Sequence, residues 1–189
     1  MLALRLFRTF ALGLPLAAPT VALAGEPFVP SWITSDPVGK SVVIDLVAGW
    51  NGNGMFSNYN GYHHGALTLL VPIGWTVTID FRNRDATGPH SMLVTAPFSE
   101  VEMQLQLSER NAVVAGAYSE RPTKGQKAGE GDRIRFTADQ AGLYYVACGV
   151  PAHLMAGMYV KLEVRDGLDR GMALMHEGEI EASDAPARP

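Results

Sequence analysis

The chain has 189 residues, a formal net charge of −4 at pH 7 and a single cysteine. A mildly acidic balance argues against a nucleic-acid-binding protein, which needs a basic surface patch. The length suits one sizeable core and is short for two, and a lone cysteine excludes disulfide bonds within the chain. We therefore expect a single domain that is stabilised by its apolar core.

Residues 1–24 have the pattern of a secretory signal peptide. Two arginines precede an apolar run over residues 10–23, and Ala22-Leu23-Ala24 supplies a small-x-small cleavage site. Two prolines interrupt the run, which disfavours a membrane span, although an uncleaved membrane anchor is the alternative. No later segment is apolar for long enough to span a bilayer. We predict export to the periplasm, with membrane anchoring only if this segment is retained.

Three further regions are distinguished by composition. Residues 25–40 are rich in proline and contain Trp32, which is typical of an N-terminal extension lying across a domain. Residues 41–165 carry the strand patterns and form the predicted domain. After Arg165 the pattern is lost and the chain ends in Ala-Pro-Ala-Arg-Pro, so residues 166–189 are expected to form a flexible tail.

The first half of the domain predicts three strands. Residues 41–47 form an apolar, β-branched run, and residues 48–65 are rich in the turn formers glycine and asparagine. Residues 66–71 and 75–82 are the next two strands, and the second alternates apolar with polar side chains. The short turn between them predicts a hairpin or one bent strand.

The second half adds the remaining strands. A polar turn leads through Gly88-Pro89 to His90 and into an apolar strand, and residues 101–107 alternate in a way that favours a strand over a helix. Further strands are predicted over 133–137, 142–148 and 158–164. Seven or eight short strands without a convincing long helix predict an all-β sandwich.

The connection between the last two predicted strands carries the candidate chemistry. Within eleven residues it places a thiol, an imidazole and two thioethers, on Cys148, His153, Met155 and Met158. Soft sulfur ligands with imidazole favour copper, because hard cations prefer oxygen and zinc rarely binds thioether. Metal binding would also explain an unpaired thiol in an oxidising compartment. Met158 has the inward parity of the following apolar strand residues, so it is preferred to Met155.

A copper site with one cysteine needs a second histidine from elsewhere in the sequence. His90 is the best candidate, because a sandwich would bring the start of its strand to the same end as the cysteine loop. His63 and His64 lie in the glycine-rich loop, and His176 lies in the expected tail. We interpret these three as ordinary surface histidines.

The pattern Cys-x4-His-x4-Met resembles the copper loop of the cupredoxins, and that of the rusticyanin and sulfocyanin group in particular. Residues 144–153, the glycine-rich stretch 51–65 and residues 67–77 are similar to sulfocyanin segments, so the resemblance covers roughly residues 41–165. It implies a cupredoxin-like Greek-key β-sandwich that binds one type 1 copper ion. The implied ligands are His90, Cys148, His153 and an axial Met158.

The resemblance also implies a function and a surface. Cupredoxins carry one electron between redox proteins, so we expect a monomer whose partners are periplasmic carriers such as cytochrome c, or a terminal oxidase. Electrons would pass through the edge of His153, and Val150, Pro151, Leu154 and Met155 would line the contact surface. Ser91, next to His90, stands where rusticyanin has serine and sulfocyanins have asparagine, and we predict a relatively high reduction potential.

Other classes fit the sequence less well. A multicopper oxidase has histidines flanking the cysteine, whereas Ala147 and Gly149 stand here, and a binuclear copper domain needs a second cysteine. Hydrolysis by Cys148 would need a base oriented by a third group, and no signature of that chemistry is present. The serious alternative is a protein that delivers or buffers copper, for which the scattered methionines offer some material. A structural sandwich with a buried, inert Cys148 is improbable, given the ligand spacing.

Overall fold

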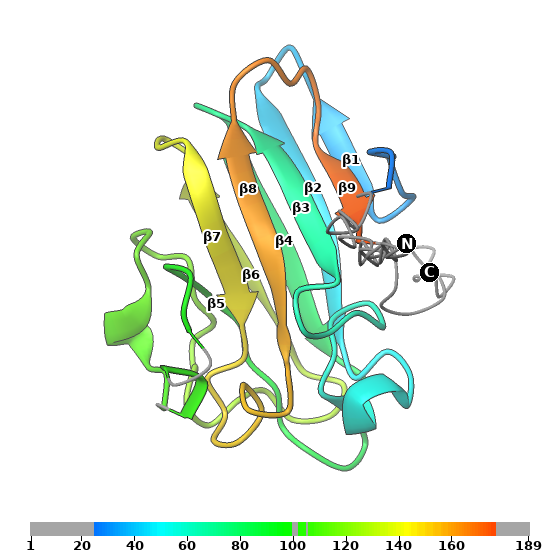
Figure 1. Cartoon of the computed structure of the whole chain (residues 1–189), viewed down its shortest axis with the longest axis vertical. Coiled ribbons are helices and arrows are strands. Elements are labelled where there is room, and N and C mark those ends of the chain that lie inside the picture. Colours follow the sequence, from blue (N-terminus) through cyan, green and yellow to red (C-terminus); the bar gives the residue numbers. More distant parts are fainter. Residues whose placement is uncertain (1–24, 100–101, 105, 177–189) are drawn as a thin grey trace, which may run out of the picture.

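Two β-sheets packed face to face make up the domain in the computed structural model, which describes residues 25–99, 102–104 and 106–176 (Figure 1). Within these residues one sheet has the strand order β1-β2-β4-β6, and the other has the order β5-β7-β8-β3-β9. Both sheets are mixed, because β2 runs parallel to β4 and β3 runs parallel to β8. The strands are β1 (Ile33–Asp36), β2 (Ser41–Ala48), β3 (Leu67–Pro72), β4 (Thr76–Asn83), β5 (Leu93–Thr95), β6 (Gly131–Thr137), β7 (Gly142–Ala147), β8 (Tyr159–Arg165) and β9 (Met172–Met175).

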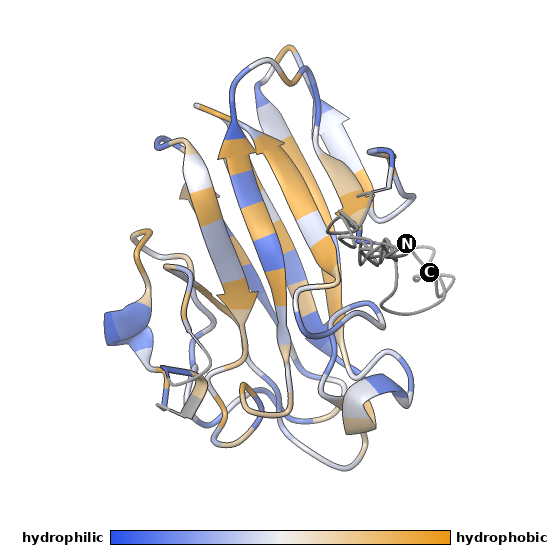
Figure 2. Cartoon of the chain, viewed as in Figure 1, coloured by the Kyte–Doolittle hydropathy of each residue, from blue (hydrophilic) through white to orange (hydrophobic). Residues whose placement is uncertain are grey.

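The core lies between the two sheets and follows the period-two pattern of the sequence. On β8 the inward side chains Val160, Leu162 and Val164 are buried, while the alternating side chains between them are partly exposed. Figure 2 shows this alternation along β8, whereas β3 is apolar over most of its length and is buried at every position. The all-β sandwich predicted from the sequence is confirmed.

The two ends of the described chain contribute strands that the sequence did not predict. β1 lies inside the segment expected to be an extension and pairs with β2, and β9 lies inside the expected tail and pairs with β3. The prediction of a flexible tail is therefore wrong for Met172–Met175. Both strands are four residues long, too short for their alternation to stand out. The signal peptide predicted over 1–24 and the end of the tail, 177–189, lie outside the described residues.

Two further predictions need correction. Residues 66–71 and 75–82 do not form a hairpin, because β3 and β4 belong to different sheets and the turn at Pro72–Trp75 carries the chain from one layer to the other. The alternating segment 101–107 is not a strand where it is described: Glu102–Gln104 form a 3-10 turn, η2. Its Leu107 is buried in a small cluster with Leu93 and Ala147, on strands β5 and β7.

Two more 3-10 turns, η1 (Asn53–Phe56) and η3 (Glu109–Asn111), lie in connections. No helix within the described ranges combines the length and the hydropathy that crossing a bilayer requires. The β7–β8 loop and the entry to β5 lie at the same end of the sandwich, at the bottom of Figure 1. That end carries the candidate site.

Candidate metal centre

The antiparallel pairing of β7 with β8 sets the shape of the loop that carries most of the donors. Ala147 pairs with Tyr159, so the next residues inward along the loop, Cys148 and Met158, face each other. The Cys148 N–H donates to the Met158 carbonyl at 3.1 Å, and the Met158 N–H donates to the His153 carbonyl at 2.9 Å. Ala152 and Gly157 take positive φ angles of 70° and 81°, which turn the chain sharply. The loop is therefore closed by its own backbone, with both sulfur atoms at its base.

The second histidine reaches this loop from the segment before β5. His90 exchanges two backbone hydrogen bonds with Gln126, at 3.1 and 2.7 Å. Gly125 has a φ of 74°, and a Cβ at this position would lie 2.9 Å from the His90 nitrogen and from a Val150 methyl carbon. The loop that contains Gly125 thus packs directly between the two histidine-bearing segments, and only glycine fits there.

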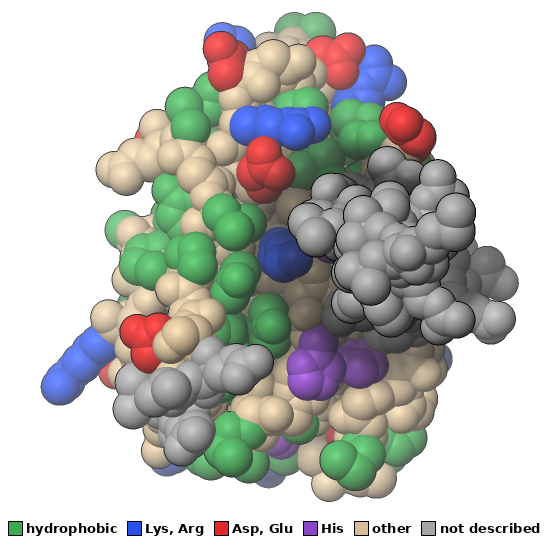
Figure 3. All heavy atoms as spheres, in the orientation of Figure 1, with side chains coloured by type: hydrophobic (Ala, Val, Ile, Leu, Met, Phe, Trp, Pro, Cys, Tyr) green, Lys and Arg blue, Asp and Glu red, His purple; other side chains and the backbone are tan. Residues whose placement is uncertain are grey.

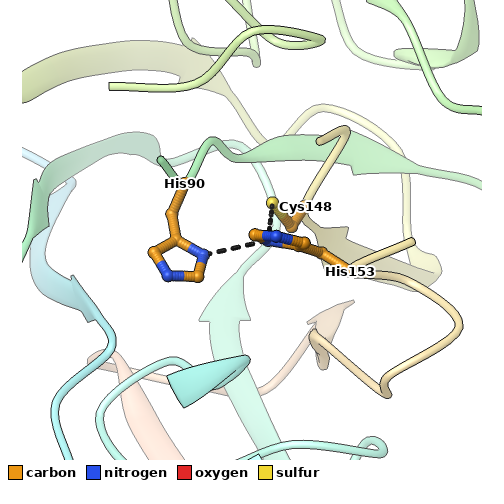
Figure 4. Close-up of side chains that lie close together, drawn as sticks. All are labelled: His90, Cys148 and His153. Atoms are coloured by element: carbon orange, nitrogen blue, oxygen red, sulfur yellow. Dashed lines mark hydrogen bonds between the residues drawn. The ribbon is translucent and has the colours of Figure 1, made fainter. Parts of the chain in front are cut away.

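Four donor atoms meet in the space enclosed by these segments. His153 Nδ1 lies 3.6 Å from Cys148 Sγ and 3.1 Å from His90 Nδ1, so its ring sits between the other two side chains (Figure 4). His90 Nδ1 also lies 3.0 Å from Met158 Sδ. The ligand atoms of His90, Cys148 and His153 all lie within 4.8 Å of one another. The structure brings together all four residues that the sequence analysis singled out as ligands.

Burial governs the protonation of these groups. It lowers the pKa of His153 to about 4, with the nearby His90 as a second cause, and it also lowers the pKa of His90. Both imidazoles are therefore neutral near pH 7, which is the form that binds a metal. Burial raises the pKa of the Cys148 thiol, against the opposing effect of hydrogen bonds from the backbone of Ser91 and Val150. A buried thiol of this kind keeps its proton near pH 7, and it loses the proton when it coordinates a metal ion.

Ser91 fastens the His90 segment to the cysteine loop. Its N–H donates to Cys148 Sγ at 3.4 Å, and its hydroxyl donates to the Pro122 carbonyl at 2.6 Å while accepting from the Gly149 N–H at 3.0 Å. On the opposite side, the buried Tyr59 hydroxyl donates to the Ser91 carbonyl at 2.5 Å. Ser91 therefore contacts the sulfur and is itself held by groups from three separate connections of the sandwich.

Asp85 is a functional neighbour that the sequence analysis missed. It is 4% exposed, and its Oδ2 accepts from His90 Nε2 at 2.9 Å. Burial would raise the pKa of this carboxyl, but hydrogen bonds from Thr87 and His90 outweigh it and hold the pKa below its usual value. In a turn where most residues are polar or charged, nothing marks Asp85 as different from Arg84. Only the folded turn shows that one of them points inward.

The remaining candidates lie apart from this group. Met155 is 61% exposed on the loop, so it offers no inward donor, whereas Met158 is fully buried. His64 is exposed and packs on Gly157, and the Nε2 atom of His176 lies 2.8 Å from the Thr68 hydroxyl oxygen. Leu154, expected on the contact surface, is instead buried in the cluster with Leu93 and Leu107. That expectation is wrong because the loop turns this side chain back onto β5 and β7.

The donor set fits copper. Two neutral imidazoles and a thiol converge with a buried thioether, and this combination of nitrogen and soft sulfur is the one that type 1 copper centres use. No carboxylate oxygen belongs to the group of ligand atoms found among the described residues, which argues against calcium or magnesium. The site therefore fits a single type 1 copper ion.

Comparison with protein families and with curated proteins gives one consistent result. Residues 31–172 match the family model described as the Sulfocyanin (SoxE) domain. The curated sulfocyanin of Sulfolobus acidocaldarius is 25% identical over 126 residues, which cover 65% of this chain. The match spans 63% of the length of that relative.

Two solved structures of similar proteins align with this chain. Reduced rusticyanin aligns with a TM-score of 0.50 and 23% identity, covering 67% of this chain and 81% of rusticyanin. Reduced auracyanin from the photosynthetic bacterium Roseiflexus castenholzii aligns with a TM-score of 0.48 and 20% identity, covering 67% of this chain and 97% of auracyanin. At this level of identity the rusticyanin alignment shows a shared sandwich, and the chemistry depends on the residues described above.

Proposed function

This chain belongs to the sulfocyanin domain family, and on that basis we propose that it is a periplasmic one-electron carrier with one type 1 copper ion. The observation that carries the proposal is the convergence of four donors from two distant segments, with His90 on one and Cys148, His153 and Met158 on the other. We propose these four as the ligands, with Met158 in the axial position. Copper bound there would supply a centre that alternates between Cu(I) and Cu(II).

The protein's part is to hold the donors in one arrangement for both oxidation states. His90, Cys148 and Met158 are at most 1% exposed, and backbone hydrogen bonds fix the loop between the two sulfur-bearing residues. A buried group with bonded neighbours moves little, because packed interiors leave no room for alternative positions. A rigid, dry site keeps rearrangement small when an electron arrives or leaves.

A contact surface for redox partners is supported by the residues around His153. His153 is partly exposed, and Pro151, Ala152 and Met155 beside it are exposed. In Figure 3, most charged side chains on the face shown gather at the opposite end, and apolar side chains appear at the lower edge. A small apolar surface suits short-lived encounters. We propose a cytochrome c or a terminal oxidase as the partner.

The periplasmic location rests on the signal peptide pattern of residues 1–24 alone. N-terminal sequencing of the protein recovered from the periplasmic fraction tests it, and a chain that begins at Gly25 is expected. An intact N-terminus in the membrane fraction would contradict export as a free protein.

The copper function is tested by visible and electron-paramagnetic-resonance spectra of the Cu(II)-loaded protein and its Cys148→Ser variant. We expect an intense thiolate-to-copper band and a narrow copper hyperfine splitting, both lost in the variant. A colourless protein that binds Cu(I) without this band would instead support the copper-delivery alternative.

A further inference from the structure

Among the residues that the structure describes, Asp85 is the carboxylate found in contact with the proposed ligand set. We infer that it is a positioning residue that fixes the His90 imidazole and lowers the reduction potential of the centre. The inference rests on the copper function proposed above. Asp85 contacts two other residues of its turn, Asn83 and Thr87, and the His90 ring.

The turn aims the carboxylate at the ring. Asp85 Oδ1 accepts from both the N–H and the hydroxyl of Thr87, at 2.7 and 2.6 Å, while the Asp85 N–H donates to Asn83 Oδ1 at 2.8 Å. Asn83 is buried and donates to the carbonyls of Gly88 and Gln126. With Oδ1 engaged by Thr87, Oδ2 is directed to His90 Nε2. The carboxylate is therefore held by its own turn and is not free to rotate away.

This contact decides which nitrogen of His90 faces the site. An ionised carboxylate only accepts hydrogen bonds, so Nε2 must carry the proton of the neutral ring. The lone pair is then on Nδ1, the atom that lies 3.0 Å from Met158 Sδ and 3.1 Å from His153 Nδ1. Asp85 thus presents His90 in the tautomer that binds a metal through Nδ1.

The same contact affects the potential. A carboxylate that accepts from the far nitrogen makes an imidazole a stronger donor, and its negative charge favours the more positive oxidation state. Both effects stabilise Cu(II) over Cu(I). Asp85 is 4% exposed, so solvent and salt screen its charge weakly. Among the described residues, the partner found for Asp85 Oδ2 is the neutral His90 ring, through a hydrogen bond, although Lys124 and Lys127 line the same open cavity.

The decisive variant is Asp85→Asn, which keeps the shape and an acceptor oxygen but removes the charge. At a fixed solution potential we expect the Cu(I) to Cu(II) ratio to rise about tenfold, which corresponds to a shift of about 59 mV for one electron. Asp169→Asn is the matched control, because Asp169 is an exposed carboxylate in the segment after β8 and makes the same change in net charge. We expect the control to keep the wild-type ratio.

Thr87→Val provides a second variant on an exposed side chain, where loss of folding is not expected. It removes one hydrogen bond to Oδ1 and leaves more charge on the carboxylate, so we expect the ratio to change in the opposite direction. If Asp85→Asn and Asp169→Asn give the same ratio, the inference is wrong. If the wild-type protein lacks the thiolate-to-copper band, the proposed function itself fails, so the two failures are distinguishable.

The tautomer is tested without copper. Long-range proton–nitrogen NMR spectra of the copper-free protein are expected to show His90 with a protonated Nε2 and a bare Nδ1. Asp85→Ala, which removes the acceptor, is expected to populate the other tautomer. Wild-type protein with the proton on Nδ1 would overturn the positioning role.

Discussion

Met158 and Met155 lie three residues apart on one loop and have opposite environments. Met158 is fully buried opposite Cys148, with its sulfur 3.0 Å from His90 Nδ1, whereas Met155 points to solvent. The difference follows from strand parity, because Met158 continues the inward face of β8. The direction of β8 thus decides which of the two thioethers faces the site.

Replacing each methionine with leucine separates the two roles. In the copper-loaded protein, Met158→Leu is expected to change both the absorption spectrum and the reduction potential, because the axial ligand tunes a type 1 site. Met155→Leu is the matched control and is expected to change neither. Equal spectra for the two variants would contradict the axial assignment.

Tyr59 shows how a single buried hydroxyl supports the site from the connection between β2 and β3. Tyr59→Phe leaves the buried Ser91 carbonyl without this donor, which costs about 1–3 kcal/mol in the free energy of unfolding. Tyr144→Phe is the control, since its hydroxyl donates to Gln140 in an exposed setting and should contribute less than about 0.5 kcal/mol. Denaturant unfolding of the copper-free variants measures both values, and similar losses would contradict the supporting role of Tyr59.

At the level of elements, the loop before β6 fixes the distance between the two histidine-bearing segments. Gly125 and Gly129 lie four residues apart in this loop, both with positive φ angles, of 74° and 79°. A Cβ at Gly125 would collide with the His90 segment, while nothing lies within 4 Å of a Cβ at Gly129. Both glycines therefore satisfy a positive φ angle, and Gly125 in addition leaves room for the His90 segment.

This pair gives a prediction that separates strain from packing. Gly129→Ala carries the backbone cost alone, about 1–2 kcal/mol. Gly125→Ala adds a clash worth a further 1–3 kcal/mol or so and displaces His90, so it should also weaken copper binding. Thermal unfolding and copper titration of both variants check this. Equal copper affinity in the two would mean that the loop does not position His90.

On the scale of the whole molecule, the candidate metal centre lies at one end of the sandwich, far from the turn between β1 and β2. The turn between β1 and β2 exposes Val38 at one end, and the copper loop exposes Met155 at the other (Figure 1). Two molecules exchanging electrons must bring their copper ends together, so a charge at Met155 is opposed by the same charge on the partner.

The electron self-exchange rate of the copper-loaded protein therefore tests which end is used. Met155→Glu is expected to slow self-exchange by about tenfold at low salt, with partial recovery at high salt. Val38→Glu adds the same charge at the other end and is expected to leave the rate unchanged. Slower exchange in Val38→Glu than in Met155→Glu would place the contact surface elsewhere.

The sequence by itself determined the sandwich and three candidate donors, Cys148, His153 and Met158, because these depend on local patterns. His90 was predicted from the expected place of its strand in the sandwich and from the resemblance to cupredoxins. Period-two alternation identifies strands such as 158–164, and the spacing Cys148–His153–Met158 reflects one tight loop between neighbouring strands. Three features were not predicted: the four-residue edge strands, the change of sheet at Pro72–Trp75 and the turn at 102–104. Local sequence does not say which strand a segment will pair with.

Only the tertiary structure decided which groups surround the donors. Asp85, Tyr59 and Gly125 reach the site from separate segments, and their roles depend on directions and distances that arise when the two sheets pack. Leu154, which was expected on the surface, is likewise buried in a cluster beneath the loop. The donors of one short loop are neighbours in the sequence, so their spacing can be recognised there. The residues that surround them are far apart in the chain, and they come together only when the two sheets pack.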